Sequence, residues 1–297
     1  QARTVRILQA VTNPRLILDN DDTFGVTKLP KKGKNNRDLI DTIKKMSKND
    51  LTPKLKEVCR IAEDLATCSG KYKSKDGKKK NVIIYTLFVG NVDIIGSDDP
   101  KSPGLLLYHS SKNIRLDPIC ITGNNPPKTE EREVRINEFK NWNPEKEKCG
   151  KILVATIGSI AEAVSLHKNE RGEAVCQHVI YLERGYNAGQ FMQSKYRVYR
   201  IGSDKRKPIQ YYFLKSLRNA KTGGTIDTID EDVHVTLEER EKVMHELLAD
   251  PMHLVKPVAM EVDTYEDKNG RKLPWGPDVT FDDIQNRTRK RMKKKSR

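Results

Sequence analysis

The sequence predicts an α/β fold in which a parallel sheet is flanked by helices. Several short runs of apolar residues contain no charge, which is typical of strands buried on both faces of a sheet. These runs alternate with segments of helical periodicity, and that alternation is typical of βαβ units. Strands joined in this way form a parallel sheet with right-handed crossovers. The 297 residues suffice for one large domain with appendages.

The first fifty residues are predicted to form a leading helix followed by a mobile connection. Residues 4–12 carry apolar side chains at helical spacing, and a proline closes the segment. These apolar side chains are Val5, Leu8 and Val11. Residues 19–50 are rich in Asp, Asn, Lys and Gly, a composition that indicates a connection between ordered parts.

The next segment, LTPKLKEVCRIAEDLA, predicts a helix that packs on the sheet. Thr52 is of a residue type that caps helices, and Pro53 suits the first helical turn. A stripe of apolar residues at helical spacing follows, consisting of Leu55, Val58, Ile61 and Leu65. Beyond it, residues 71–80 form a basic loop.

Five strands and four further helices complete the prediction. The strands are expected at residues 81–88, 118–122, 151–156, 177–182 and 208–214. A charged helix is expected across residues 128–142, a helix of small residues after the third strand, and another helix after the fourth. The last helix is expected at residues 235–249.

The charge of the chain favours a polyanionic partner, nucleic acid before membrane. Hydrophobic residues make up 36% and charged residues 33% of the chain, with a net charge of +15. The pI is about 9.5. Such a balance is typical of nucleic-acid-binding proteins, although solubility is an alternative reason for it. The end of the chain, NRTRKRMKKKSR, has eight basic residues in twelve and is predicted to be disordered until it meets an anion.

Cysteine usage and hydropathy bear on the compartment. The five cysteines are irregularly spaced, without a CxxC pair, which favours reduced thiols in the cytoplasm or nucleus. No signal peptide is recognisable, and no apolar run approaches the roughly 18 residues of a membrane span. Cys176 and His178 lie two residues apart but lack a second pair of ligands, so no metal site is expected.

Residues at the predicted carboxyl ends of the strands are candidates for a site. In parallel α/β sheets, ligands bind at this edge. Thr86, Gly123, Thr156 and Glu183 follow or end four of the predicted strands. The loop leading into the helix after the fourth strand is expected there as well.

The helix after the fourth strand ends in the stretch QSKYRVYRIGSDK. Arg197 and Arg200 are three residues apart, a spacing that places side chains on one helix face. The surrounding sequence resembles the sixth motif of SWI/SNF-like DNA translocases of helicase superfamily two. The matching positions are Tyr186, Asn187, Gln190, Gln193, Arg197, Arg200, Ile201, Gly202, Pro208 and Ile209.

Other segments resemble this family in the same order, over about residues 4–250. TVRILQAVTNPRLIL is similar to the helix that leads into the second motor lobe, and NVIIYTLF is similar to the fourth motif. The stretch ITGNNPPKTEEREVRINEF resembles a family segment with a spaced glycine, arginine and phenylalanine, and its loose matches are Gly123, Arg132 and Phe139. The fifth motif departs from the SWI/SNF pattern, because residues 162–166 resemble the Glu-Gly-Ile-Ser-Leu of other superfamily-two enzymes.

The resemblance implies a RecA-like lobe, the second of two, which contributes to an ATP site between the lobes. It implies that Arg200 is an arginine finger, with Arg197 as its partner on the phosphates or on a bridging carboxylate. Gln193 would order the water or the helix. Glu162, Ser165 and Gly202 are expected to support the ATP site. The first lobe, expected in the same full-length chain, would supply the phosphate loop and hold most of the Mg²⁺ coordination.

For nucleic acid, the best candidates are Thr156 and Thr86, because a hydroxyl at a strand end suits a phosphate oxygen. Either threonine could equally be a cap. Lys205 and Arg206, together with the basic loop at residues 71–80, add positive charge that would follow a phosphate backbone without reading bases. For residues 71–80, a solvated loop is an equal alternative. The resemblance implies that Glu183 couples the two sites, and a plain surface carboxylate is the alternative.

The sequence lacks the first-lobe motifs, since no GxxxxGK[ST] occurs. The stretch DEDVH resembles an acidic helicase motif, but no apolar strand precedes it. We therefore expect no ATP hydrolysis by this chain alone. Duplex DNA is the favoured substrate, and RNA is the alternative substrate. The alternative function is that of a non-catalytic basic module with the same fold.

The predicted boundaries are a leading segment at 1–50, the lobe at 51–225, a bracing helix at 226–250 and a basic tail at 251–297.

Overall fold

The computed structural model describes most of the chain up to residue 247. The described residues are 2–17, 43, 45, 51–99, 101, 103–107, 114–126, 128–161, 166–199, 208–216, 218–219, 225–226 and 228–247. Two compact units result, one of residues 1–216 with 229–241 and one of residues 217–228 with 242–297. In the second unit, β6 (Arg218–Asn219) pairs antiparallel with β7 (Thr225–Ile226).

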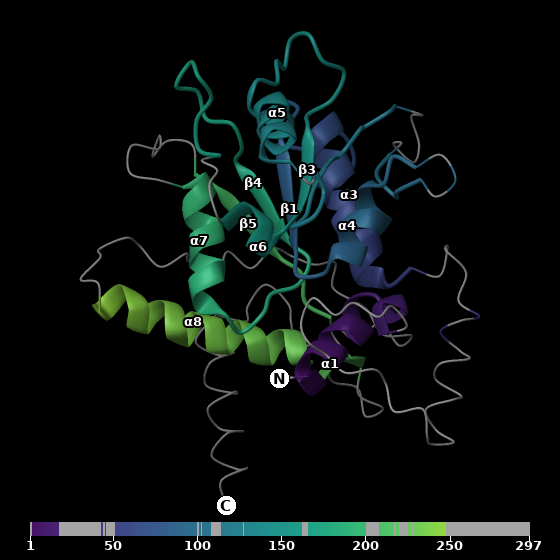
Figure 1. Ribbon diagram of the computed structural model, residues 1–297, viewed down its shortest axis with the longest axis vertical. Helices are drawn as coiled ribbons and strands as arrows, with labels where there is room; N and C mark the ends of the chain where they lie inside the picture. The colour runs from purple at the N-terminus through teal and green to yellow at the C-terminus, as the bar shows by residue number, and fades with distance from the viewer. Residues whose placement is uncertain are drawn as a thin grey trace, which may run out of the picture. The chain divides into compact units, whose positions relative to one another are not determined.

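The first unit is built on a sheet of five parallel strands in the order β2-β3-β1-β4-β5 (Figure 1). The predicted α/β class and all five predicted strands are therefore confirmed. The strands are β1 (Val82–Thr86), β2 (Ile119–Ile121), β3 (Ile152–Thr156), β4 (His178–Tyr181) and β5 (Gln210–Phe213). All residues of β1, β3 and β4 are buried, as expected for central strands covered on both faces.

Helices cover both faces of this sheet. Figure 1 shows α3 and α4 on one side and α6 and α7 on the other. The helices between the strands are α3 (Pro53–Thr67), α4 (Val89–Gly96), α5 (Thr129–Lys140), α6 (Ile157–Ala161) and α7 (Ala188–Val198). The sequence predicted all of them except α4, which buries Val92 and Ile95 against the sheet.

The start of α3 follows the predicted capping pattern. The Thr52 hydroxyl accepts a hydrogen bond from the Leu55 amide at 3.3 Å, and Pro53 occupies the first helical position. The predicted apolar stripe is buried in the core together with Val82 and Ile84 of β1. This helix therefore forms where the sequence places it.

The chain outside the alternating units is also helical. The leading helix α1 (Ala2–Thr12) is followed by the 3-10 turn η1 (Pro14–Ile17). The last helix, α8 (Ile229–Leu247), begins six residues before the predicted start, so DEDVH forms its first turns. Acidic residues in a first turn interact favourably with the helix dipole, which explains the earlier start.

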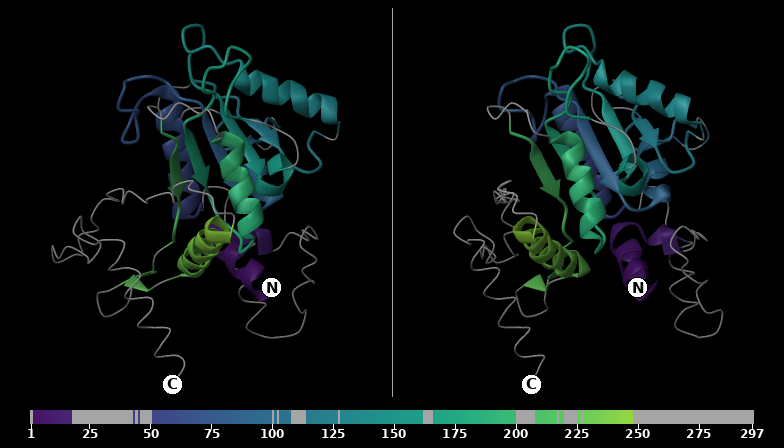
Figure 2. Two further views of the ribbon diagram at one scale, coloured as in Figure 1. Left: turned by 90° about the vertical axis from the view of Figure 1, so that its left-hand side faces the viewer. Right: turned by 60° about the vertical axis from the view of Figure 1, so that its left-hand side comes forward.

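The direction of the strands separates two ends of the sheet, the carboxyl edge and the amino edge. Helix α7 begins after β4 at the carboxyl edge, and the chain re-enters the sheet at Gln210, which pairs with His178 at the start of β4. Figure 2 shows α7 running back alongside these strands. At 1.5 Å per residue, Arg197 lies about 14 Å along the helix from its first residue. The start of α7 therefore lies at the carboxyl edge, as predicted for the loop leading into this helix, while Arg197 lies toward the amino edge.

Candidate functional site

At the carboxyl edge, the Glu183 carboxylate binds the end of the neighbouring strand β1. Its Oε1 accepts hydrogen bonds from the Thr86 hydroxyl, from the Leu87 amide at 2.8 Å and from Asn91 Nδ2 at 3.2 Å. Glu183 is only 1% exposed, so these three donors hold a carboxylate in the interior. The predicted alternative of a plain surface carboxylate is therefore wrong.

Burial and hydrogen bonding act on Glu183 in opposite directions. Burial raises the pKa of Glu183, while the Thr86 hydroxyl and the positive charge of Lys54 act to lower it. Among the described residues, the second oxygen of Glu183, Oε2, has no hydrogen-bond partner. The group is thus held in place through one oxygen only.

A chain of asparagines extends this network to the leading helix. Asn91 also donates to the Thr86 hydroxyl at 3.2 Å, and Asn13, which follows α1, donates to Asn91 Oδ1 at 3.1 Å. We call Asn13, Asn91, Thr86 and Glu183 the polar relay. The sequence reasoning missed both asparagines. Asn13 lies 78 positions before Asn91, and Asn91 lies 92 positions before Glu183, so no local sequence pattern connects them.

The relay lies where the topology favours a ligand crevice. The chain leaves β1 toward the β2 side of the sheet and leaves β4 toward the β5 side. In open α/β sheets, the carboxyl ends of two such diverging strands mark the ligand-binding position. The predicted carboxyl-edge candidates Thr86 and Glu183 are thus brought together at this point.

The two threonines predicted to contact phosphate are also neighbours. Thr86 and Thr156 are paired in the register of β1 and β3. The Thr156 hydroxyl is bonded to Ser159 Oγ at 2.9 Å, and the residue is 8% exposed. Thr86 is fully buried, so a phosphate contact by Thr86 would require its bond to Glu183 to open.

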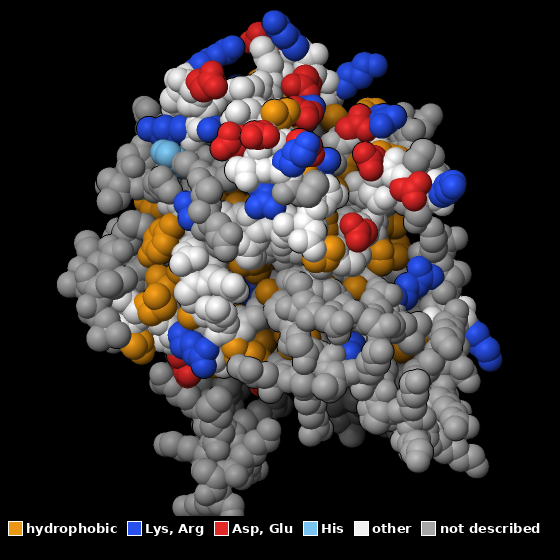
Figure 3. Space-filling model, in the orientation of Figure 1, with side chains coloured by type: hydrophobic (Ala, Val, Ile, Leu, Met, Phe, Trp, Pro, Cys, Tyr) orange, Lys and Arg blue, Asp and Glu red, His pale blue; other side chains and the backbone are white. Residues whose placement is uncertain are grey.

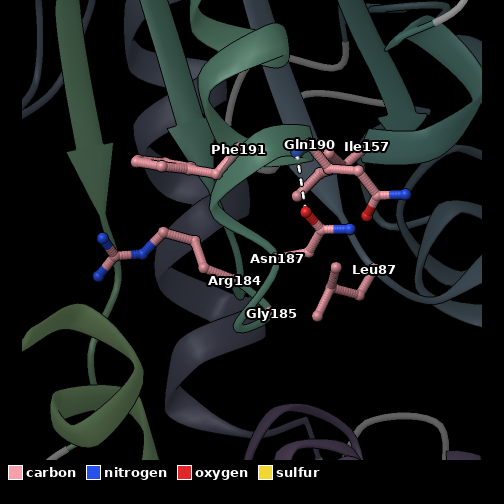
Figure 4. A pocket seen from close by; sticks show the side chains of 7 residues that line it. All are labelled: Leu87, Ile157, Arg184, Gly185, Asn187, Gln190 and Phe191. Carbon is pink, nitrogen blue, oxygen red and sulfur yellow. Dashed lines mark hydrogen bonds between the residues drawn. The ribbon is translucent and has the colours of Figure 1, made fainter. Parts of the chain in front are cut away.

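A small hollow lies beside the first turn of α7 (Figure 4). Asn187 caps this helix by accepting a hydrogen bond from the Gln190 amide at 3.1 Å, drawn as a dashed line. In the same view, the side chains of Arg184 and Phe191 point away from Leu87. The lining residues are Leu87, Ile157, Arg184, Gly185, Asn187, Gln190 and Phe191.

Arg184 lies in the interior and contacts α8. Its Nη1 is 3.0 Å from His234 Nδ1, and the guanidinium lies 4.2 Å from the centre of the Phe213 ring. Burial lowers the pKa of Arg184 to about 10. This arginine therefore joins α8 to the sheet and gives the hollow no free cation.

At the other end of α7, Gln193 and Arg197 lie one turn apart on the same helix face. Gln193 is exposed and Arg197 half-buried, and the Arg197 carbonyl accepts a hydrogen bond from the Leu166 amide at 2.8 Å. The helix ends at Val198, and Tyr199 is extended, with φ −106° and ψ 120°. The described part of this helix therefore stops before Arg200, and the expectation that Arg197 and Arg200 share a helix face stays a prediction.

Six predicted site residues lie outside the described part of the chain. They are Glu162, Ser165, Arg200, Gly202, Lys205 and Arg206.

The described residues contain no cluster that could hold a metal ion through three or more His, Cys, Asp or Glu side chains. Cys176 donates to the carbonyls of Asn81 and His178, and the His178 ring is hydrogen-bonded to the Tyr212 hydroxyl at 2.9 Å.

No helix within the described residues has the length and apolar character to cross a membrane.

The five-stranded parallel sheet and the helices on both of its faces form an α/β fold of the RecA-like class. No family model matches the chain, and no curated protein matches it either. Among solved structures, it is similar to the C-terminal part of the Fun30 ATPase domain, with 14% identity and a TM-score of 0.40 over 80% of this chain. It is also similar to T4 UvsW, with 16% identity and a TM-score of 0.37 over 73% of this chain.

The chain spans 65% of the Fun30 structure and 36% of the UvsW structure.

Proposed function

We propose that the chain is the C-terminal motor lobe of an ATP-dependent nucleic-acid translocase or helicase. It would complete an ATP site against a first RecA-like lobe and act on duplex DNA. The observation that carries the proposal is the sixth-motif sequence, whose first part lies on the helix that follows a buried parallel strand. The order of the other motifs along the same sheet supports it.

The proposed ATP contacts come from the end of α7 and the residues that follow it. Phosphoryl transfer spreads negative charge over the γ-phosphate, and a positioned guanidinium offsets this charge through paired hydrogen bonds. Arg200 is the proposed finger and Arg197 its partner, with Gln193 one turn earlier on the same face as Arg197. The amide and guanidinium donors on this face fit a phosphate by their chemistry.

The rest of the nucleotide site would be shared. Glu162, Ser165 and Gly202 are proposed to support it from this lobe. ATP would bring the γ-phosphate to which the arginines donate, and Mg²⁺ would be held mainly by the first lobe. The sequence supports this division, because it contains no phosphate-loop motif.

The nucleic-acid contacts are proposed at the carboxyl edge and after α7. Thr156 and Thr86 would bind phosphate oxygens, and Lys205 and Arg206 would follow the backbone. Glu183 would couple the sites, because it joins the ends of β1 and β4 and connects to α1 through Asn91. Duplex DNA is favoured by the SWI/SNF-like sixth motif alone.

The proposal is tested in a protein in which a first motor lobe precedes this chain. ATP hydrolysis is measured with and without duplex DNA for the wild type and for the Arg200→Ala, Arg197→Ala and Arg171→Ala variants. Arg171 is exposed on the turn before β4 and serves as the matched control. We expect Arg200→Ala to lower kcat on the order of 10³-fold, the scale seen for arginine fingers. The control should retain the wild-type rate.

Different failures separate the alternatives. An unchanged rate in Arg200→Ala would show that the finger assignment is wrong. No ATP hydrolysis in the two-lobe protein would leave the non-catalytic module as the function. Competition between matched duplex DNA, duplex RNA and single strands tests the substrate, and stronger stimulation by RNA would overturn the DNA preference.

A further inference from the structure

Two neighbouring loops at the amino edge carry an excess of lysine. Residues 71–80 lead into β1 and residues 143–151 lead into β3, and these strands are adjacent and paired in register from Val82 and Ile152. The loops therefore lie side by side, at the end of the sheet opposite the polar relay. Figure 2 shows the loop before β1 near the end from which the strand arrows start.

The first loop is fixed to α3. Gly70 has φ +66°, and a Cβ on it would clash with the carboxylate of Asp64. That carboxylate accepts a hydrogen bond from the Tyr72 amide at 3.0 Å, and the Tyr72 hydroxyl donates to Glu57. The loop thus leaves the helix in one conformation, set by a glycine and an anchored tyrosine.

The tip of this loop is a tight turn. The Gly77 amide bonds to the Ser74 carbonyl at 3.1 Å, and Asp76 accepts from the Ser74 hydroxyl at 2.7 Å and from the Lys78 amide at 3.1 Å. Asp76 also pairs with Lys80 at 2.5 Å. The only carboxylate of the loop is therefore occupied by contacts within it.

The second loop is joined directly to the first. The Lys79 ammonium donates to the Glu147 carbonyl at 2.8 Å, and a Cβ on Gly150 would clash with the Lys80 carbonyl oxygen. Close approach of the two backbones therefore requires a glycine at position 150. The two loops form one surface, which we call the lysine platform, consisting of residues 71–80 and 143–151.

The charge of the lysine platform is unbalanced. It holds nine lysines and three carboxylates. Figure 3 shows Lys and Arg side chains together with Asp and Glu side chains at the upper end of the face drawn there. Within the described residues, five of these lysines are exposed and form no ion pair; they are Lys73, Lys75, Lys78, Lys146 and Lys148.

We propose that the lysine platform binds the phosphate backbone of nucleic acid, at a site separate from the contacts proposed at the carboxyl edge. Ammonium groups presented by a fixed turn gain from releasing counterions of a polyanion, and they read no bases. A fixed backbone loses less conformational entropy on binding than a flexible basic tail does. The surface stands independently of the motor proposal, because it needs neither ATP nor a second lobe.

The test measures binding of the full chain to a fluorescent DNA duplex over a range of salt concentrations, without ATP. The variant replaces Lys73, Lys75 and Lys78 with glutamine. A control of equal charge replaces the exposed Lys56, Lys101 and Lys128. With about 0.9 per phosphate contact, the slope of log K against log salt should become shallower by roughly 2 to 3 in the variant.

The control set should change the slope by much less, and the basic tail contributes equally to both proteins. Duplex RNA and single-stranded DNA run as parallel arms identify the source of the phosphates. Equal slopes in the variant and the control set would overturn the proposal. Lysine acylation read by mass spectrometry gives a second measurement on the wild type, in which DNA should protect Lys73, Lys75 and Lys78 more than Lys56. Uniform protection would also overturn it.

Discussion

The ion pair between Lys54 and Asp230 tests how α8 is held on the sheet. The Lys54 ammonium lies 2.7 Å from Asp230 Oδ1, with side chains 3% and 5% exposed. The other oxygen of Asp230 accepts a hydrogen bond from the Ser216 amide at 2.8 Å. The pair therefore joins the first turn of α3 to the first turn of α8 in the interior.

Replacing Lys54 alone leaves the carboxylate of Asp230 buried without its cation. Lys54→Met keeps about the length of the side chain and removes the ammonium, with its charge and its hydrogen bond to Asp230. Breaking a buried pair in this way typically costs about 3 to 5 kcal/mol in the free energy of unfolding. In the double variant Lys54→Met with Asp230→Asn, no unpaired charge remains, and the asparagine oxygen still accepts from Ser216. We expect the double variant to recover about 2 kcal/mol or more.

The assay is urea unfolding of the wild type, both single variants and the double variant, monitored by circular dichroism. Lys128→Met is the matched control, because Lys128 lies 3.9 Å from Glu131 with 71% of its side chain exposed. It should unfold like the wild type. The reasoning would be refuted if Lys54→Met cost no more than this control, or if the double variant were no more stable than the single one.

Two further stability predictions concern a turn and a buried histidine. Gly70→Ala should be more destabilising than Gly77→Ala, because both glycines have positive φ but only Gly70 faces a side chain, that of Asp64. The αL backbone costs an alanine about 1 to 2 kcal/mol at either position. Equal urea midpoints for the two variants would contradict the additional clash with Asp64. Burial and the charge of Arg184 lower the pKa of His234 from 6.5 to about 2, so the unfolded chain takes up the proton first and stability is lost as the pH falls below 6.5. Glu238, whose pKa burial raises to about 7, contributes the opposite slope, so His234→Gln is compared in a Glu238→Gln background. There it should flatten the loss of stability between pH 7 and pH 5, and an unchanged pH profile would contradict the assignment.

The strands could be predicted because each is a short apolar run with no competing period. Val82, Ile84 and Val154 are fully buried on one face, and Ile83 and Leu153 on the other, so both faces demanded apolar residues. The capped start of α3 was predictable for a similar reason, since Thr52 and Pro53 act within one turn. Local chemistry decided both cases.

The polar relay and the end of α7 could not be predicted in this way. Asn13, Asn91 and Glu183 meet only because α1, α4 and β4 converge at one edge of the sheet. Helical spacing from Arg197 to Arg200 predicts one helix face, and this stays a prediction because the described helix ends at Val198. The segment that follows contains a β-branched residue and a glycine, Ile201 and Gly202, neither of which favours continuing a helix.

Helix α7 runs from the carboxyl edge, where Thr86 and Thr156 are proposed to bind nucleic acid, to Arg197, which is proposed to bind ATP. The helix is fixed to the sheet along its length. The Phe191 ring lies 5.2 Å from the ring of Tyr181, and the Tyr181 hydroxyl is hydrogen-bonded to Ser194 at 2.7 Å. Lys195 pairs with Glu241 of α8 in the interior. In the proposed motor, a phosphate bound by Arg197 would therefore pull on a helix that cannot shift alone. The force would reach the carboxyl edge through β4, whose end is bonded to β1 by Glu183, and this is why the relay is proposed to couple the two sites.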